Sequence, residues 1–448
     1  MKGSRRVVIT GVGVISPLGN SLAVLTESLK AGKSAGAPIS TFGTEGFPIR
    51  IGAQVADFDA RKLVRQRKAI KMMARDVQFG VAAAGLAIDD AKLSVASTDF
   101  EKPTEDPTRI GTSFGAGLIN SEVDELAPCV VASRKAQWGE IEDYRRRMAE
   151  AYDMDNFGAG LMRNLFPLWL LKYLPNMPAC HVTIIHDLQG PNNSLTAGDA
   201  VGLQAVGEGA RIIERGSADV MVCGGTDCTV NPLSLLDQEL LHRVTHRNDD
   251  PAHASRPFEL KRDGVLMGEG AAVVILEELE RARKRGASIY AEVVGYGCGC
   301  DAYRVDRVHP EGRGIQVAMR AALKDAGMSG GDLSYLGAHG ISGIEEDKAE
   351  SFAVKKVFGE STRTVPVSAV KSMLGHPGSA SGVMDLVCAL AGMREGFIPP
   401  TINYEQPDPD CDLNIVANEP RQAEVDRVMV NAFGLGGQAA ALVVKRMD

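Results

Sequence analysis

The chain lacks a long uninterrupted hydrophobic run. Its most apolar stretch, LMRNLFPLWLLKYLPNMPAC, carries Arg163, Lys172 and three prolines, whereas a membrane-spanning helix needs about 20 consecutive apolar residues. The N-terminus leads from two arginines straight into an apolar strand, without the hydrophobic segment or cleavage site of a signal peptide. These absences argue against a membrane span and predict a cytoplasmic protein.

Paired cysteines and an excess of positive charge are also missing. The eight cysteines form no CxxC pair and show no metal-ligand spacing, which predicts reduced thiols and no metal site. The net charge of −8 argues against general binding of nucleic acid. What is present is 44% apolar residues in a chain of 448, enough to bury a large core in two or three domains or in one duplicated architecture.

The stretch from Gly190 to Gly225 is the most informative part of the chain. Its sequence, GPNNSLTAGDAVGLQAVGEGARIIERGSADVMVCGG, predicts a loop, an amphipathic helix from near Asp199 to about Arg215, a turn at Gly216 and an apolar strand. A loop that delivers a polar side chain to a helix N-terminus suits a nucleophile or a bound anion. Here the side chain is the carboxylate of Asp199.

Two pairs of segments indicate an internal duplication. MARDVQFGVAAAGLAIDDAKL followed by RIGTSFGAG resembles GIQVAMRAALKDAGMSGGDL followed by YLGAHGISG. More loosely, the helix after Asp199 and its strand ADVMVCGG resemble GHPGSASGVMDLVCALAGMREG and FIPPTIN. These repeats predict a duplicated α/β domain with halves at 1–284 and 285–448. The charged segment 130–155 is interpreted as an insertion in the first half.

A cluster of cations follows near residue 60. In RKLVRQRKAIKMMARD no acidic residue occurs until Asp76. A solvated helix face is the simplest interpretation, but uncompensated cations on an acidic protein also suit docking of an acidic partner. The candidate docking residues are Arg65, Arg67, Lys68 and Lys71.

Three loops of the second half carry candidate chemistry. His339 lies in GAHGISG, Lys371 and His376 lie in AVKSMLGHPGSASG, and Phe433 lies in NAFGLGG. A lone histidine is more often structural than catalytic. Together on strand-end loops of a duplicated α/β fold, these elements indicate one functional site.

With these motifs in view, the chain resembles the β-ketoacyl-acyl carrier protein synthases of the elongating, type II kind. The matching stretches are RRVVITGVGVISPLG, the GPN block with ADVMVCGGTD, SRPFELKRDGVLMGEGAAVVILEE, VKSMLGHPGSASG and NAFGLGG. The resemblance implies a thiolase-like α/β fold with a duplicated five-layer α-β-α-β-α architecture. It also implies a homodimer, or a heterodimer with a related ketosynthase, acting in fatty acid or polyketide biosynthesis. The substrates would be acyl groups on an acidic acyl carrier protein, whose phosphopantetheine arm serves as substrate carrier, with no other cofactor.

The resemblance also implies roles for single residues. The two histidines that polarise the malonyl thioester carbonyl correspond to His339 and His376, and the lysine that supports them corresponds to Lys371. The acidic residue of the following helix corresponds to Glu350. The position of the acyl-accepting cysteine is occupied by Asp199. An aspartate that attacked a thioester would form a mixed anhydride, so condensation through an acyl-enzyme is not expected.

Three further positions depart from the family pattern. The two threonines that contact the pantetheine arm are replaced by Ile341 and Gly343, and the second phenylalanine of the closing loop, a gate to the acyl pocket, is Leu435 beside Phe433. The nearest cysteines in strand or turn, Cys223 and Cys228, are expected to be inert.

Three functional hypotheses follow. The first is an enzyme in which His339, His376 and Lys371 bind a thioester carbonyl while Asp199 acts as a general base in decarboxylation, hydrolysis or direct condensation. The second is a non-catalytic subunit, like a chain-length factor, that pairs with a cysteine-bearing synthase. The third is a scaffold that only binds carrier protein.

Overall fold

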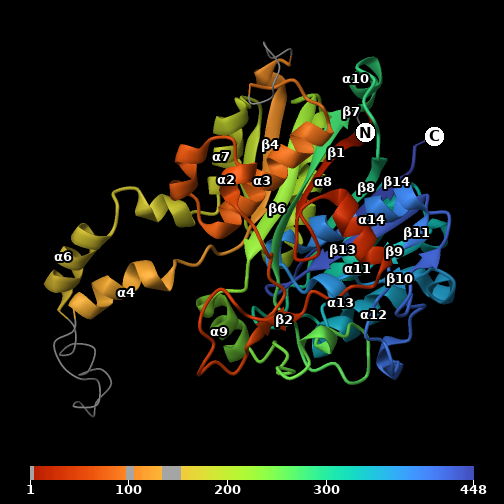
Figure 1. The fold of residues 1–448 in the computed structure, drawn as a ribbon. Helices are drawn as coiled ribbons and strands as arrows, with labels where there is room; N and C mark the ends of the chain where they lie inside the picture. Colours follow the sequence, from red (N-terminus) through yellow and green to blue (C-terminus); the bar gives the residue numbers. More distant parts are fainter. Residues whose placement is uncertain (1–4, 97–104, 134–152, 448) are drawn as a thin grey trace.

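A ten-stranded β-sheet forms the centre of the computed structural model, which describes residues 5–96, 105–133 and 153–447 (Figure 1). The strand order is β10-β9-β13-β14-β8-β1-β7-β6-β4-β5. The strands are β1 (Val7–Ile15), β4 (Ile110–Ala116), β5 (Asn192–Leu195), β6 (Val220–Cys228), β7 (Glu269–Glu278), β8 (Ala291–Cys300), β9 (Tyr335–Gly337), β10 (Val367–Ser368), β13 (Arg427–Phe433) and β14 (Gln438–Lys445). Two small sheets pair β2 (Ala37–Pro38) with β3 (Ile51–Gly52), and β11 (Phe397–Ile398) with β12 (Arg421–Gln422).

Helices cover and connect this sheet. They are α1 (Leu22–Lys30), α2 (Ala60–Leu63), α3 (Arg75–Asp90), α4 (Val123–Ala132), α6 (Met154–Asn164), α7 (Met177–His186), α8 (Val201–Glu214), α9 (Pro232–Leu240), α10 (Leu279–Lys284), α11 (Arg313–Ala326), α12 (Ile344–Phe358), α13 (Lys371–Leu374) and α14 (Ser381–Glu395). Within the described ranges, none has both the length and the apolar character that crossing a bilayer requires.

The sheet is built from two equivalent halves. Strands β1, β7, β6, β4 and β5 form one half, and β8, β14, β13, β9 and β10 form the other. The strand directions follow the same pattern in both halves. In each half the first two pairs of neighbouring strands are antiparallel, and the last two pairs are parallel. The halves join where β1 pairs antiparallel with β8, Val7 opposite Val293. The duplication predicted from the repeats is therefore seen in the topology.

The helices form three layers around the two halves of the sheet. Helix α3 packs on β1, β6 and β7, and its counterpart α11 packs on β8 and β14. Helices α8 and α14 contact each other in the middle, α8 against β6 and β4 and α14 against β13. One core cluster contains side chains of both halves, from Val7 through Leu203 and Leu386 to Val444. This arrangement gives the expected sequence of layers, helix, sheet, helix, sheet, helix.

The first strand is longer than its sequence suggests. The pattern predicts a strand at 7–10 and then a glycine-rich turn, but β1 continues through the glycines. A Cβ atom at Gly13 would lie 1.9 Å from the carbonyl oxygen of Ala83 in α3. The same contact recurs in the other half, where a Cβ at Gly297 would lie 2.2 Å from the carbonyl oxygen of Ala318 in α11. The glycines therefore allow close helix packing rather than a turn.

In the second half, the helix that corresponds to α8 belongs with a different strand from the one expected. Helix α14 was matched with the strand-like FIPPTIN, yet the residues there form only β11, outside the main sheet. The counterpart of β6 is β13. The two prolines at 399 and 400 lack the N–H groups that a central strand needs, which explains the short strand.

Helices α4 and α6 project together from the body of the molecule (Figure 1). They pack against each other, and the Asp153 amide donates a 2.8 Å hydrogen bond to the Ser133 carbonyl oxygen. We call residues 118–133 and 153–173 the arm. Most of the predicted insertion 130–155 lies outside the described residues.

Candidate active site

Asp199 lies at the start of the middle-layer helix α8. It belongs to a short 3-10 turn, Gly198–Ala200, that leads directly into α8, so the predicted helix start is confirmed. Gly198 adopts φ +60°, a left-handed conformation that suits glycine. The preceding segment differs from the expected loop because 192–195 pair with β4 as the edge strand β5.

His376 lies beside Asp199. Its Nε2 atom is 3.2 Å from Asp199 Oδ2. The backbone of His376 is held by β7 and the residues before it, since its N–H donates to Leu266 O at 2.8 Å and its carbonyl oxygen accepts from Gly268 N at 2.9 Å. The pair therefore joins the N-terminus of α8 to the loop before α14, across the two halves.

His339 completes a cluster with these two residues. Its ring stands perpendicular to that of His376, with centroids 5.5 Å apart, and lies 4.5 Å from the Phe433 ring. Glu350 fixes the loop, because its carboxylate accepts from the backbone N–H groups of His339 and Gly340, each at 2.8 Å. Glu350 thus acts on the backbone and makes no hydrogen bond to the imidazole in the described structure.

Lys371 is buried and pairs with Asp385 of α14. The sequence analysis missed Asp385, although a single carboxylate in the apolar run GVMDLVCALAG was a usable signal. It also missed Arg243, whose guanidinium donates to Glu346 at 3.0 Å. Asp385 and Glu346 thus balance the positive charges of Lys371 and Arg243 near the histidines.

The electrostatic environment of the cluster determines its charges. Burial raises the pKa of Asp199, but His376, Arg243 and Lys371 together outweigh burial and leave that pKa below its ordinary value. Burial, followed by the charges of Lys371, His376 and Arg243, lowers the pKa of His339 well below its ordinary value. Asp199 is thus a carboxylate and His339 a neutral imidazole near pH 7.

Asp199 and His376 line a pocket of about 200 Å³. Asp227 also lines it and accepts a 2.9 Å hydrogen bond from Ser379 N. Burial raises the pKa of Asp227 to about 6. The pocket connects the ion pair with the surface between the arm and α9, since Asn120 and Gln238 lie on its wall.

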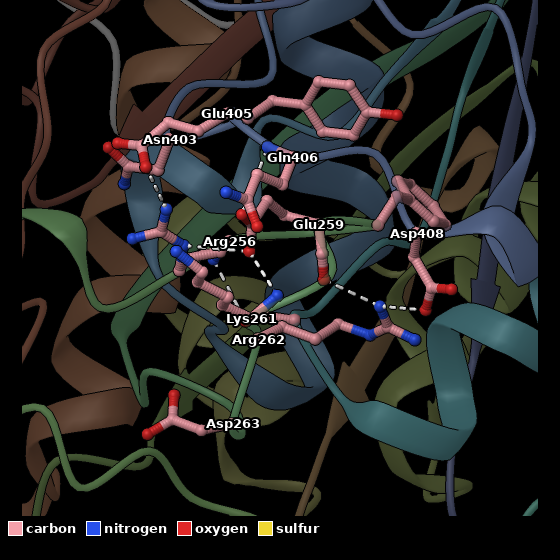
Figure 2. Close-up of polar contacts among 12 residues, drawn as sticks. Arg256, Glu259, Lys261, Arg262, Asp263, Asn403, Glu405, Gln406 and Asp408 are labelled. Atoms are coloured by element: carbon pink, nitrogen blue, oxygen red, sulfur yellow. Dashed lines mark hydrogen bonds and ion pairs between the residues drawn. The ribbon is translucent and has the colours of Figure 1, made fainter.

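A buried ion-pair network lies in and around the segment 256–262 (Figure 2). Arg256 pairs with Glu259 at 3.2 Å, and Arg262 pairs with Asp408 at 2.7 Å (Figure 2). This network holds the segment 256–262, whose Phe258 ring would lie 2.9 Å from a Cβ at Gly340. The glycine after His339 is therefore needed for close packing.

The three departures from the family pattern have local structural correlates. Ile341 is buried in an apolar cluster with Val230 and Leu266. A Cβ at Gly343 would lie 2.4 Å from Glu346 Oε2, so a larger residue there would require Glu346 to move. Leu435 is half-buried in the loop over Asp199.

Cysteines near the site are poor nucleophiles. Burial raises the pKa of the Cys223 thiol, and the Cys228 thiol, at the end of β6, donates to Glu269 at 2.9 Å with its pKa also raised, chiefly by burial. Neither thiol lies on the wall of the pocket that Asp199 lines.

The basic segment is only partly free to dock a partner. Arg65 pairs with Asp89 at 2.7 Å, and Arg75 pairs with the buried Glu269 at 2.7 Å. Arg67, Lys68 and Lys71 are exposed on a 3-10 helix at 67–72. No ion pair reaches these three from any residue that the structure describes. They remain the candidate docking residues.

Comparison with known proteins defines the class. The chain belongs to the β-ketoacyl synthase family: the Beta-ketoacyl synthase N-terminal domain matches residues 4–282, and the C-terminal domain matches residues 290–405. The thiolase-like fold expected from the resemblance is thereby confirmed.

Curated relatives and solved structures match the chain over nearly its whole length. It is 38% identical over 446 residues to 3-oxoacyl-[acyl-carrier-protein] synthase 2 of Coxiella burnetii, covering 99% of both chains. It is 34% identical to the enzyme of that name from Staphylococcus aureus, covering 100% of both. A structure of the ishigamide ketosynthase/chain length factor matches with a TM-score of 0.81 and 31% identity, over 99% of this chain and 100% of that one.

Proposed function

We propose that the protein acts on malonyl and acyl thioesters of an acyl carrier protein and decarboxylates the malonyl group without forming an acyl-enzyme. The single observation that carries this proposal is the buried cluster of His339, His376, Lys371 and Asp385, of which His376 lines the pocket. Buried charges and unpaired imidazoles cost stability. A subunit without catalysis has no evident physical need for them.

The chemistry follows from the hydrogen-bonding capacity of the histidines. In the proposed reaction, an imidazole N–H of His339 donates to the malonyl thioester oxygen, and the Nε2–H of His376 is shared between that oxygen and Asp199 Oδ2, 3.2 Å away. The bond between the carboxylate and the methylene carbon breaks, carbon dioxide leaves, and the electron pair forms an enolate held by these donors. The enolate carbon then takes a proton, or attacks a second acyl thioester and expels its thiolate.

Asp199 has a different role from the one expected of a general base. Its lowered pKa makes it a weak base for carbon acids, but decarboxylation needs no base. Its contact with His376 orients that imidazole.

The second candidate is a non-catalytic subunit that pairs with a cysteine-bearing ketosynthase. The absence of a thiol at Asp199 favours it, together with the likeness to the ketosynthase/chain length factor structure. Carrier protein would then dock on the pair, and this chain would shape the acyl site of its partner.

The test is mass spectrometry of carrier species after incubation with malonyl- and acyl-loaded carrier protein. The wild-type chain should convert malonyl carrier to acetyl or ketoacyl carrier without a mass adduct on itself. Asp199→Asn should lower turnover by roughly 10–100-fold, because the His376 ring loses its charged partner. Asp199→Cys should gain an acyl adduct, because a thiolate at this position can be acylated.

Unchanged carrier species in the wild type, with co-purification of a cysteine-bearing relative, would reject the enzymatic proposal in favour of the paired subunit. Full activity of Asp199→Asn would remove Asp199 from the mechanism.

A further inference from the structure

We propose that Asp199, His339 and His376 form a binding site for one divalent transition-metal ion. No metal site was expected, because the cysteines show no metal-ligand spacing. The structure brings one carboxylate oxygen and one nitrogen of each imidazole within 4.8 Å of one another. This inference concerns metal binding and does not rest on the proposed reaction, which uses the same histidine nitrogens in the metal-free protein.

The distances are close to those of a metal site. Tetrahedral ligands about 2.0–2.2 Å from an ion lie roughly 3.3–3.6 Å apart. His376 Nε2 and Asp199 Oδ2, 3.2 Å apart, are already at about that separation. The third ligand atom needs a shift of about 1 Å or slightly more, which imidazole rotation can supply.

Unsatisfied nitrogen atoms provide a second, independent indication. Neither ring nitrogen of His339, a fully buried residue, has a hydrogen-bond partner among the described residues, and the same holds for Nδ1 of His376. Buried polar atoms are normally paired, and an unpaired one requires an explanation. A metal ion would satisfy a nitrogen atom of His339.

The charges around the cluster allow a cation. Lys371 is held by Asp385, and Arg243 is held by Glu346. The carboxyl groups of Asp199 and Asp227 both line the same pocket. The nearby cations therefore have their own counter-ions, and the Asp199 carboxylate is available to an incoming ion.

The ligand types select the class of metal. Two imidazoles and one carboxylate suit Zn²⁺, Co²⁺ or Fe²⁺ rather than Mg²⁺ or Ca²⁺, which prefer oxygen ligands. Three protein ligands leave at least one position open, and Asp199 and His376 line the pocket. Because no carboxylate or carbonyl of the described residues orients either imidazole from behind, we expect metal affinity about 10–100-fold below that of a site with such partners.

The experiment uses the full chain, stripped with a chelator and desalted. Equilibrium dialysis against Zn²⁺, followed by elemental mass spectrometry, counts the bound ions. The wild type should bind one more Zn²⁺ ion per chain than Asp199→Ala or His339→Asn. His246→Asn serves as the matched control, since His246 is an exposed histidine that also contacts a carboxylate, Glu239. His246→Asn should bind as many Zn²⁺ ions per chain as the wild type. Circular dichroism verifies that each variant is folded.

Cobalt gives a readout that only direct coordination can change. The wild type loaded with Co²⁺ should show the visible absorption of a low-coordinate ion. Asp199→Cys should keep the ion and add a sulfur-to-cobalt charge-transfer band in the near ultraviolet. Equal Zn²⁺ content in wild type and Asp199→Ala, or a Co²⁺ spectrum that Asp199→Cys leaves unchanged, would overturn the proposal. A metal-stripped chain that leaves every carrier species unchanged, but binds the ion when it is reloaded, would instead overturn only the proposed function.

Discussion

Asp76 is a buried carboxyl close to a second one. It lies in the first turn of α3, is 5% exposed, and accepts a hydrogen bond from Val77 N at 2.8 Å. Burial, and after it the charge of Asp227, raises the pKa of Asp76 to about 7. The folded protein therefore holds this proton more tightly than the unfolded chain, whose carboxyl titrates near pH 4.

The consequence is a loss of stability as pH rises from about 4 to about 7, where ionisation of Asp76 increasingly opposes folding. We compare the free energy of unfolding of Asp76→Asn with that of the wild type at two pH values. We predict that the difference favours the variant by on the order of 2–4 kcal/mol more at pH 8 than at pH 4.5. Thermal melts across this pH range measure the difference. Asp249→Asn, at an exposed site, should show no such trend, and parallel pH profiles of Asp76→Asn and wild type would contradict the prediction.

The residues of the site were predictable to different degrees. His339, Lys371 and His376 could be found because each lies among small residues on a loop that follows or precedes a regular element. Asp385 and Arg243 could not be assigned in the same way, because their importance depends on which cation or carboxylate the fold places opposite them. The low pKa of Asp199 likewise follows from three neighbours that only the structure brings together.

At the scale of single elements, the basic 3-10 helix gives a prediction about the carrier protein. Replacing Arg67, Lys68 and Lys71 by Ala should weaken binding of acyl carrier protein by roughly tenfold or more and reduce its salt dependence, since exposed cations act mainly through long-range attraction. Titration calorimetry at two ionic strengths measures both effects. Replacing the exposed Lys324, Lys356 and Arg363 of the other half should have little effect. Equal losses in the two variants would mean that docking is not localised.

The arm carries about half of the large hydrophobic side chains that are exposed in the described residues. Val131 is 70% exposed and Met162 is 86% exposed. Large apolar side chains exposed in such number on one segment are typical of a subunit interface. We propose that a second copy of this chain covers the arm.

We predict that the wild type is a dimer and that Val131→Glu together with Met162→Glu shifts it toward monomer, because burying two carboxylates in an apolar interface is costly. Sedimentation equilibrium gives the mass. Val305→Glu, at an equally exposed valine of the other half, should remain dimeric. A monomeric wild type that dimerises only with a cysteine-bearing relative would favour the paired-subunit hypothesis.

The type of most elements could be predicted, but not all of their limits. The sequence pattern predicts a helix at about 21–31, and α1 occupies Leu22–Lys30, capped by the Ser21 side chain. The extension of β1 was missed, because glycine marks turns in a sequence but here makes room for α3. The pairing of 192–195 was missed because the polar NNSL has no strand pattern, and β4 imposes its register.

At the scale of the whole molecule, the two halves depend on each other. Pairing of β1 with β8 and packing of α8 on α14 bury surface that either half alone would expose. We predict that 1–284 and 285–448, produced separately, do not fold to the native state, and that co-expression yields a complex with native circular dichroism. Co-purification through a tag on one fragment tests this. A separately folded first half would contradict it, and would show that the middle layer is not required.

The central position of β1 also has a consequence for protein synthesis. Val7 pairs with Glu278 on one side and with Val293 on the other, so both neighbours of β1 in the sheet are synthesised long after β1 itself. At about 5–20 residues per second, this interval lasts on the order of tens of seconds. During it, an apolar strand with two open edges is exposed to solvent and to other nascent chains. Chaperone capacity and translation speed between β1 and β7, more than the stability of the finished protein, are therefore expected to limit how much of it a cell can accumulate.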